Sequence, residues 1–85
     1  MSTTTRDEIM PNPVTATIDG ETYHGGICFG PRAEWVAMIE SPGCQPAFFW
    51  AADKADAMRH GAGEVDRREA RGVTASARLF PTDPA

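Results

Sequence analysis

The sequence predicts an α+β fold: a small antiparallel sheet of about five strands, in the order β-β-β-β-α-β, with one helix packed on one face. Three observations support this class. Apolar and polar residues alternate over residues 14–18, three consecutive aromatic residues follow a Pro-Gly turn signal, and a helical pattern starts at Asp53. The chain has 85 residues, 41% hydrophobic and 24% charged, which is the composition of one small globular domain.

The first two strands are predicted to form a hairpin within VTATIDGETYHG. Apolar residues alternate with threonines on its first strand, and its central Asp-Gly dipeptide is favoured in two-residue hairpin turns. Such a turn places Ile18 opposite Glu21 and Ala16 opposite Tyr23.

The second predicted hairpin spans residues 33–51. Residues 33–40 favour a strand because apolar residues alternate from Trp35 to Ile39, although Pro31 and the helix formers within the segment would also suit a short helix. The segment SPGCQP contains a Pro-Gly pair suited to a type II turn. The aromatic run AFFWA is then the returning strand.

A helix is predicted over residues 53–60 with Asp53 as its N-cap, and its continuation to about residue 70 is left open because Gly61 and Gly63 interrupt the pattern. Apolar residues at helical spacing are expected to pack on the sheet: Ala51, Ala55, Met58, Ala62 and Val65. The last strand is predicted within residues 73–80, where alternate apolar residues share one face.

The domain is predicted to span residues 13–80. Residues 1–12 are polar and rich in proline, which predicts a disordered N-terminal tail, and residues 81–85 predict a flexible C-terminal tail. A domain of this size buries only about 60% of its unfolded surface. Binding to a partner, or to a second copy of the chain as a homodimer, would bury additional surface.

The charge distribution bears on the partner. The net charge is −4, and residues 1–52 carry two arginines and six acidic residues, giving 2 − 6 = −4. An acidic half argues against direct nucleic-acid binding and favours a partner with a basic surface. No run approaches the ~18 apolar residues of a membrane helix, and no signal peptide is recognisable, so a cytoplasmic location without membrane contact is expected. Arginine far outnumbers lysine, which suggests a GC-rich bacterial or phage genome.

Catalytic and nucleotide-binding motifs are incomplete. Gly25 to Gly30 match the start of a phosphate-binding loop, but Pro31 and Arg32 replace its lysine and hydroxyl residue. The adjacent glycines at 25 and 26 are therefore read as a bulge or bend in a strand. The sequence also lacks a nucleophile elbow. We expect no enzyme activity and no cofactor.

A metal site is one alternative to this interpretation. His24, Cys28, Cys44 and His60 make up a Cys2His2 set. However, His24 and Cys28 would lie about 13 Å apart on an extended strand, and no C-x-x-C pair is present. No metal site is predicted, and a zinc-stabilised or self-assembling structural module stays an alternative.

The aromatic run at residues 48–50 points to protein binding. A strand must turn consecutive aromatic side chains to both of its faces, so either both faces are covered or some rings are exposed anchors. We predict a small acidic non-catalytic binding protein that inhibits a protein or nucleoprotein partner by occupying its functional surface, as phage-encoded inhibitors such as anti-CRISPR proteins do. The predicted contact residues are Glu21, Glu34, Trp35, Glu40, Phe48 and Trp50.

One local resemblance suggests another partner. The stretch WVAMIESPGC, followed by a helix beginning DKADAM, resembles the HicB-type antitoxins, whose small sheet runs into a Pro-Gly-Cys turn and then a helix with acidic residues and alanines. The resemblance covers about twenty residues between Trp35 and Met58. It implies, as an alternative function, an antitoxin that neutralises a small basic toxin.

Overall fold

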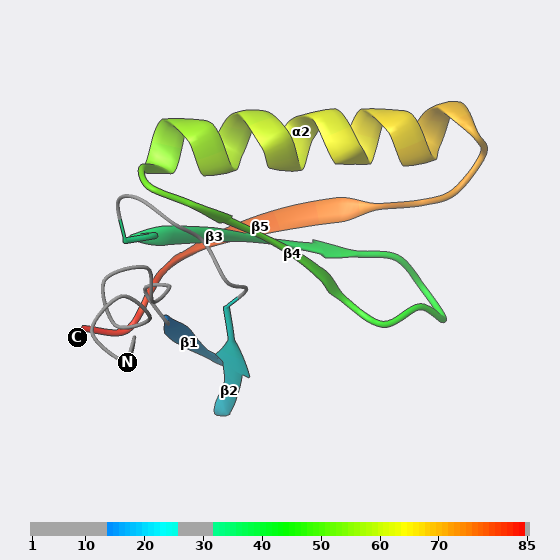
Figure 1. The fold of residues 1–85 in the computed structure, drawn as a ribbon. Helices are drawn as coiled ribbons and strands as arrows, with labels where there is room; N and C mark the ends of the chain where they lie inside the picture. Colours follow the sequence, from blue (N-terminus) through cyan, green and yellow to red (C-terminus); the bar gives the residue numbers. More distant parts are fainter. Residues whose placement is uncertain (1–13, 26–31, 85) are drawn as a thin grey trace, which may run out of the picture.

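The computed structural model describes residues 14–25 and 32–84. Its elements follow the predicted order: β1 (Thr15–Ile18), β2 (Glu21–His24), β3 (Trp35–Glu40), β4 (Ala47–Ala51), α2 (Lys54–Ala70) and β5 (Ser76–Pro81). The α+β class is thereby confirmed. The strands form two antiparallel sheets, one of β1 and β2 and one in the order β4-β3-β5. The three-stranded sheet lies between α2 on one face and the β1–β2 hairpin on the other (Figure 1).

The β1–β2 hairpin has the predicted register. Ile18 pairs with Glu21, and Ala16 pairs with Tyr23. The two turn residues between the strands have φ angles of 53° and 85°. Positive φ at both positions is what a type I′ hairpin turn requires, and the Asp-Gly dipeptide accepts it at little steric cost.

The second hairpin confirms that residues 35–40 form a strand and not a helix. β3 pairs with β4 in a register that sets Ala37 against Phe49, and it pairs on its other edge with β5. The turn glycine, Gly43, has a φ of 79°, which agrees with the predicted type II turn. β3 is thus the central strand, and β4 and β5 are the two edges of the sheet.

The helix α2 starts where predicted and continues through both glycines. The Asp53 side chain accepts a hydrogen bond of 2.8 Å from the Asp56 N–H, which is the expected N-cap. The helix ends at Ala70, and Gly72 follows it with a φ of 82°. The helix therefore spans 17 residues, and tertiary contacts with the sheet offset the low helix propensity of its glycines.

The prediction of which helical residues pack on the sheet is wrong for most of them. Three of them are exposed: Ala55, Met58 and Ala62. The buried helical residues are Ala57 and Gly61 instead. A Cβ on Gly61 would lie 3.3 Å from the Cβ atoms of both Ala37 and Ala77. The helix is rotated so that its smallest side chains meet the sheet, because this orientation allows the closest approach.

The core consists of two layers, one on each face of the three-stranded sheet. On the hairpin side, the buried residues are Ala16, Ile18, Val36 and Met38. On the helix side, they are Ala37, Ile39, Ala51 and Ala57. Alternate residues of β3 therefore point into different layers, as the period of a strand requires.

The C-terminal residues join the two sheets. β5 begins at Ser76, three residues after the start of its predicted segment, and it runs through Pro81, past the predicted domain boundary at residue 80. Thr82 N–H then donates to the Glu34 carbonyl at 3.0 Å, and Asp83 N–H donates to a β1 carbonyl at 2.8 Å. The Asp83 carboxylate also accepts hydrogen bonds of 2.9 and 3.0 Å from two threonine hydroxyls of β1. The predicted N-terminal tail lies outside the described residues.

Candidate protein-binding surface

The structure does not bring all six predicted contact residues onto one surface. Four of them lie on the hairpin side of the three-stranded sheet or on the hairpin itself: Glu21, Glu40, Phe48 and Trp50. Trp35 faces the helix, and the Lys54 ammonium lies 5.1 Å from the centroid of its ring. Glu34 precedes β3 and uses its backbone to bond to Ala51 and Thr82. Trp35 therefore lies on the other face of the sheet from these four, and Glu34 is exposed just before the strand.

The aromatic run of β4 is divided between the two faces of the sheet. Phe48 and Trp50 point toward the hairpin, and Phe49 points toward the helix, where it stacks on His60 with ring centroids 4.0 Å apart. Each face of the strand is thus partly covered. Phe48 lies 4.7 Å from Tyr23 and 6.1 Å from Trp50, measured between ring centroids. These three rings form a continuous row of half-buried aromatic side chains.

Gly25 allows Trp50 to pack in this row. Its N–H donates to the Val14 carbonyl at 2.7 Å and so extends the β1–β2 ladder by one bond. A Cβ on Gly25 would lie 2.5 Å from Val14 Cγ2 and 3.1 Å from two atoms of the Trp50 ring. Gly25 is therefore a close-packing position. The bend predicted at Gly25 and Gly26 includes a residue outside the described range.

Three carboxylates gather at the turn end of the hairpin, next to the aromatic row. Arg78 donates from Nη2 to Asp19 Oδ2 and from Nε to Glu40 Oε1, both at 3.2 Å. Tyr23 OH donates to Glu21 Oε1 at 2.7 Å. The hydrogen bond to Glu21 is the main cause of a raised Tyr23 pKa, and burial and the negative charges of all three carboxylates raise it further.

We call the set Asp19, Glu21, Tyr23, Glu40 and Phe48 the acidic–aromatic surface. With Arg78 included, its charge is −3 + 1 = −2. The side chain of Asp19 is 71% exposed and that of Glu40 is 40% exposed, so both carboxylates can reach a partner. The surface offers negative charge beside a phenol ring, a combination suited to basic side chains.

Sequence reasoning missed Asp19 and Tyr23 as members of this surface. A local signal for Tyr23 exists, because Glu21 and Tyr23 are two residues apart on a strand and therefore lie on the same side of it. The pairing of Arg78 with Asp19 joins residues 59 apart in the chain and has no comparable local signal.

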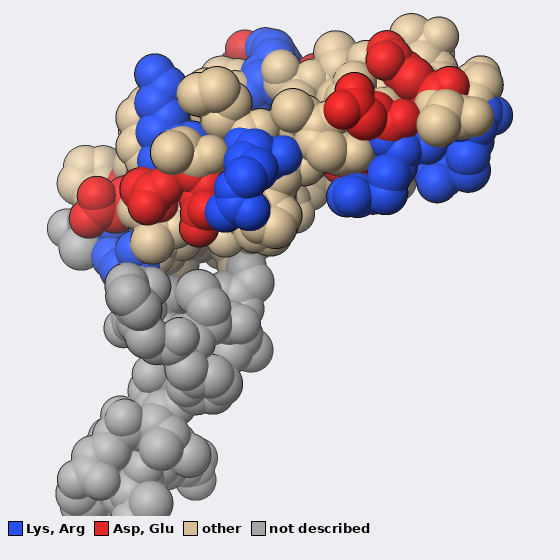
Figure 2. Space-filling view, turned by 90° about the horizontal axis from the view of Figure 1, so that it is seen from above, with Lys and Arg blue, Asp and Glu red and all other residues tan. Residues whose placement is uncertain are grey.

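The helix face has a different character. Acidic and basic side chains are interspersed over α2 when the molecule is viewed from the helix side (Figure 2). Glu64 accepts from Arg68 at 2.9 Å and from Arg67 at 3.0 Å. The hydrogen bond from Arg68 is the main cause of a lowered Glu64 pKa, and the hydrogen bond from Arg67 lowers it further. These ion pairs lie on a solvated, charge-balanced face of the helix.

The described residues of the zinc alternative lie on three different elements. His24 lies on β2, Cys44 in the β3–β4 turn and His60 on α2, and Cys28 lies outside the described residues. In residues 14–25 and 32–84, no three His, Cys, Asp or Glu side chains are placed to hold one metal ion. The placement of the described members gives no support to a zinc site.

The chain matches no protein-family model, no curated protein and no solved structure. The helix of the described residues, α2, is not long and apolar enough to cross a membrane. A function for this protein has to be inferred from the geometry and charge of its surfaces.

Proposed function

We propose that the protein is a small non-catalytic binding protein that inhibits a protein or nucleoprotein partner by covering a basic functional surface. Phage-encoded inhibitors such as anti-CRISPR proteins act in this way. The observation that best supports the proposal is the convergence of three carboxylates on Tyr23, at the end of the row of aromatic rings. We assign partner binding to the acidic–aromatic surface.

The two components of this surface contribute differently. An exposed ion pair contributes only about 0.2–1 kcal/mol to affinity. The carboxylates should therefore act mainly on the rate of encounter and on the choice of partner, through electrostatic steering that salt weakens. Tyr23 and Phe48 supply apolar contact area, and tyrosine in particular is enriched among the residues that dominate binding energy.

Neutralising two carboxylates on this surface tests the proposal. The tagged protein is used to capture partners from a GC-rich bacterial lysate, and binding of the captured protein is then measured at low and high salt. We expect the double variant Glu21→Gln, Glu40→Gln to slow association about tenfold, because two of the three steering charges are lost. Glutamine at position 21 keeps an acceptor for the Tyr23 hydroxyl, so the local structure should persist.

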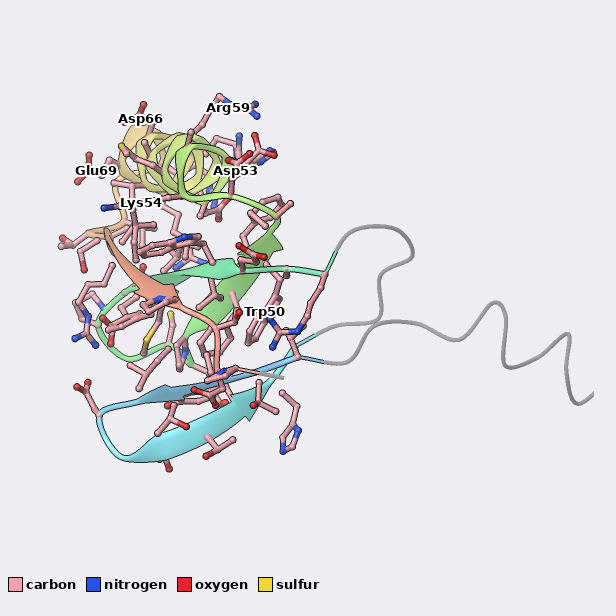
Figure 3. All side chains as sticks on the ribbon, turned by 90° about the vertical axis from the view of Figure 1, so that its left-hand side faces the viewer. Trp50, Asp53, Lys54, Arg59, Asp66 and Glu69 are labelled. Carbon is pink, nitrogen blue, oxygen red and sulfur yellow. The ribbon has the colours of Figure 1, made fainter. Side chains whose placement is uncertain are left out.

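A matched control removes two negative charges elsewhere. Asp66 and Glu69 are exposed on α2, on the opposite side of the sheet from the hairpin (Figure 3). Asp66→Asn with Glu69→Gln changes the net charge equally and should leave the association rate unchanged. Equal effects of the two double variants would refute the assignment of the surface. Capture of a small basic toxin, with growth rescued by co-expression, would favour the HicB-like antitoxin function instead.

A further inference from the structure

We propose that β4 pairs antiparallel with β4 of a second copy of the chain, which joins the two three-stranded sheets into one of six strands. The inference goes beyond the proposed function, because it concerns the protein alone and holds whatever partner the acidic–aromatic surface binds. It rests on three features of β4: an unprotected edge, outward backbone groups and a symmetric sequence.

The two edges of the three-stranded sheet are protected differently. β5 contains Arg78 and ends in Pro81, and charged residues and prolines on an edge strand discourage pairing with another chain. β4 has the sequence AFFWA, with neither charge nor proline. Of the strands the structure describes, only β3 pairs with β4. β4 is therefore the edge open to a further strand.

The register of the sheet shows which backbone groups of β4 point outward. Thr82 N–H donates to the Glu34 carbonyl, which continues the β3–β5 register by one pair. Because hydrogen-bonded pairs alternate along an antiparallel ladder, the odd-numbered residues of β3 bond to β4, as in the pair of Ala37 with Phe49. The N–H and C=O groups of Phe48 and Trp50 consequently face away from the sheet.

The sequence of β4 is close to a palindrome in residue type. An antiparallel pairing centred on Phe49 sets Phe48 opposite Trp50 of the second copy, and Ala47 opposite Ala51. In this register Phe48 and Trp50 are the hydrogen-bonded pairs, so every outward backbone group finds a partner. The aromatic rings also form cross-strand pairs, which are among the more stabilising contacts in a sheet. Shifting the centre to residue 48 would instead bring Pro46 opposite Trp50, and Pro46 has no N–H to donate.

The helices of such a dimer face each other across the joined sheet. The symmetry axis passes near Phe49, on which His60 stacks, so the two helices run antiparallel with His60 near the axis. Three strand spacings separate them, roughly 14 Å, which is too wide for direct helix packing but within reach of long side chains. Arg67, whose side chain is 64% exposed, then lies opposite Asp53 at the start of the other helix, and Glu64 lies opposite Asp56.

The space between the helix and the β4 edge is already open to receive the second copy. A depression of about 210 Å³ lies there, with a floor of Ile39, Ala47 and Phe49 and a rim that includes His60 and Arg67. In the proposed dimer this apolar floor is covered by Phe49 and Ala51 of the second copy, because Ala47 lies opposite Ala51. The covered area adds to the small core of the domain.

The oligomeric state of the purified protein tests the proposal. Light scattering during gel filtration, over a range of concentrations, should give twice the chain mass of 9.2 kDa. Ala47→Lys places a charge at the proposed interface and should restore the mass of a single chain. Ser76→Lys adds the same charge at an exposed position on β5 and should leave the dimer intact. Circular dichroism establishes that both variants fold.

Amide hydrogen exchange in the unmodified protein gives a second test that needs no substitution. The amides of Phe48 and Trp50 should be protected, and protection should rise with protein concentration. The outward amides of Ala77 and Leu79 on β5 should exchange quickly and serve as the internal control. A single-chain mass at every concentration, or equal exchange at the two edges, would overturn the proposal. Protection that appears only when another protein is added would also overturn it, and would assign the edge to that partner.

Discussion

A matched pair of glycine substitutions in α2 tests how closely the helix approaches the sheet. Gly61 and Gly63 both lie inside the helix, two residues apart, and replacing either by alanine should gain about 1 kcal/mol of helix propensity. They differ in what the added methyl group would meet. On Gly63 the nearest atom is Arg67 Nη1 at 3.6 Å, the end of a flexible side chain. We expect Gly63→Ala to stabilise the protein by about 1 kcal/mol.

At Gly61 the same methyl group meets the sheet. It would lie 3.3 Å from the Cβ atoms of Ala37 and Ala77, and both atoms are fixed by the backbones of paired strands. The helix would have to move outward by a few tenths of an ångström along its contact with the sheet, and overpacking of this kind costs about 1–3 kcal/mol. Because this cost exceeds the gain in propensity, we expect Gly61→Ala to destabilise the protein by about 1 kcal/mol.

Thermal and urea denaturation of the two variants measure the difference directly. A gap of about 2 kcal/mol corresponds to melting temperatures roughly 10 °C apart in a domain of this size. The order of stability should be Gly63→Ala, then the unmodified protein, then Gly61→Ala. Equal stabilisation by both substitutions would refute the close approach of the helix at Gly61, and with it the explanation of why Ala57 and Gly61 are the helical residues that meet the sheet.

Two further predictions concern the contacts that hold the hairpin to the sheet. Gly25→Ala should lower the melting temperature and change the fluorescence of Trp50, because a methyl group would lie 2.5 Å from Val14 Cγ2 and 3.1 Å from the Trp50 ring; an unchanged melting temperature would contradict this packing. Asp83 has a pKa below its ordinary value of 3.8, chiefly through the hydrogen bond from the Thr15 hydroxyl. Its contribution to stability is therefore present above about pH 4 and lost as the pH falls through the lowered pKa. Asp83→Asn should weaken the protein at pH 7 and converge with the unmodified protein toward pH 2 in urea titrations; a pH-independent difference would exclude this linkage.

Of the acidic–aromatic surface, the sequence predicted three members, Glu21, Glu40 and Phe48, and it also predicted Trp50, which lies on the same side of the sheet. Residue type alone suggested them, as acids and aromatics on predicted strands. It could not exclude Trp35, because the face that a β3 residue occupies is decided by where α2 packs. The other two members, Asp19 and Tyr23, belong to the surface because of the way the hairpin packs on the sheet.

The sequence by itself determined the local elements of this protein. The hairpin turn, the type II turn and the N-cap of the helix follow from steric preferences and hydrogen bonds between residues at most four apart, so short segments specify them. Only the tertiary structure decided how these elements meet. The rotation of α2 depends on the space between Gly61, Ala37 and Ala77, and the clustering of carboxylates depends on Arg78 reaching Asp19 across 59 residues. Such contacts are set by the close packing of segments distant in the chain, and no local pattern encodes them.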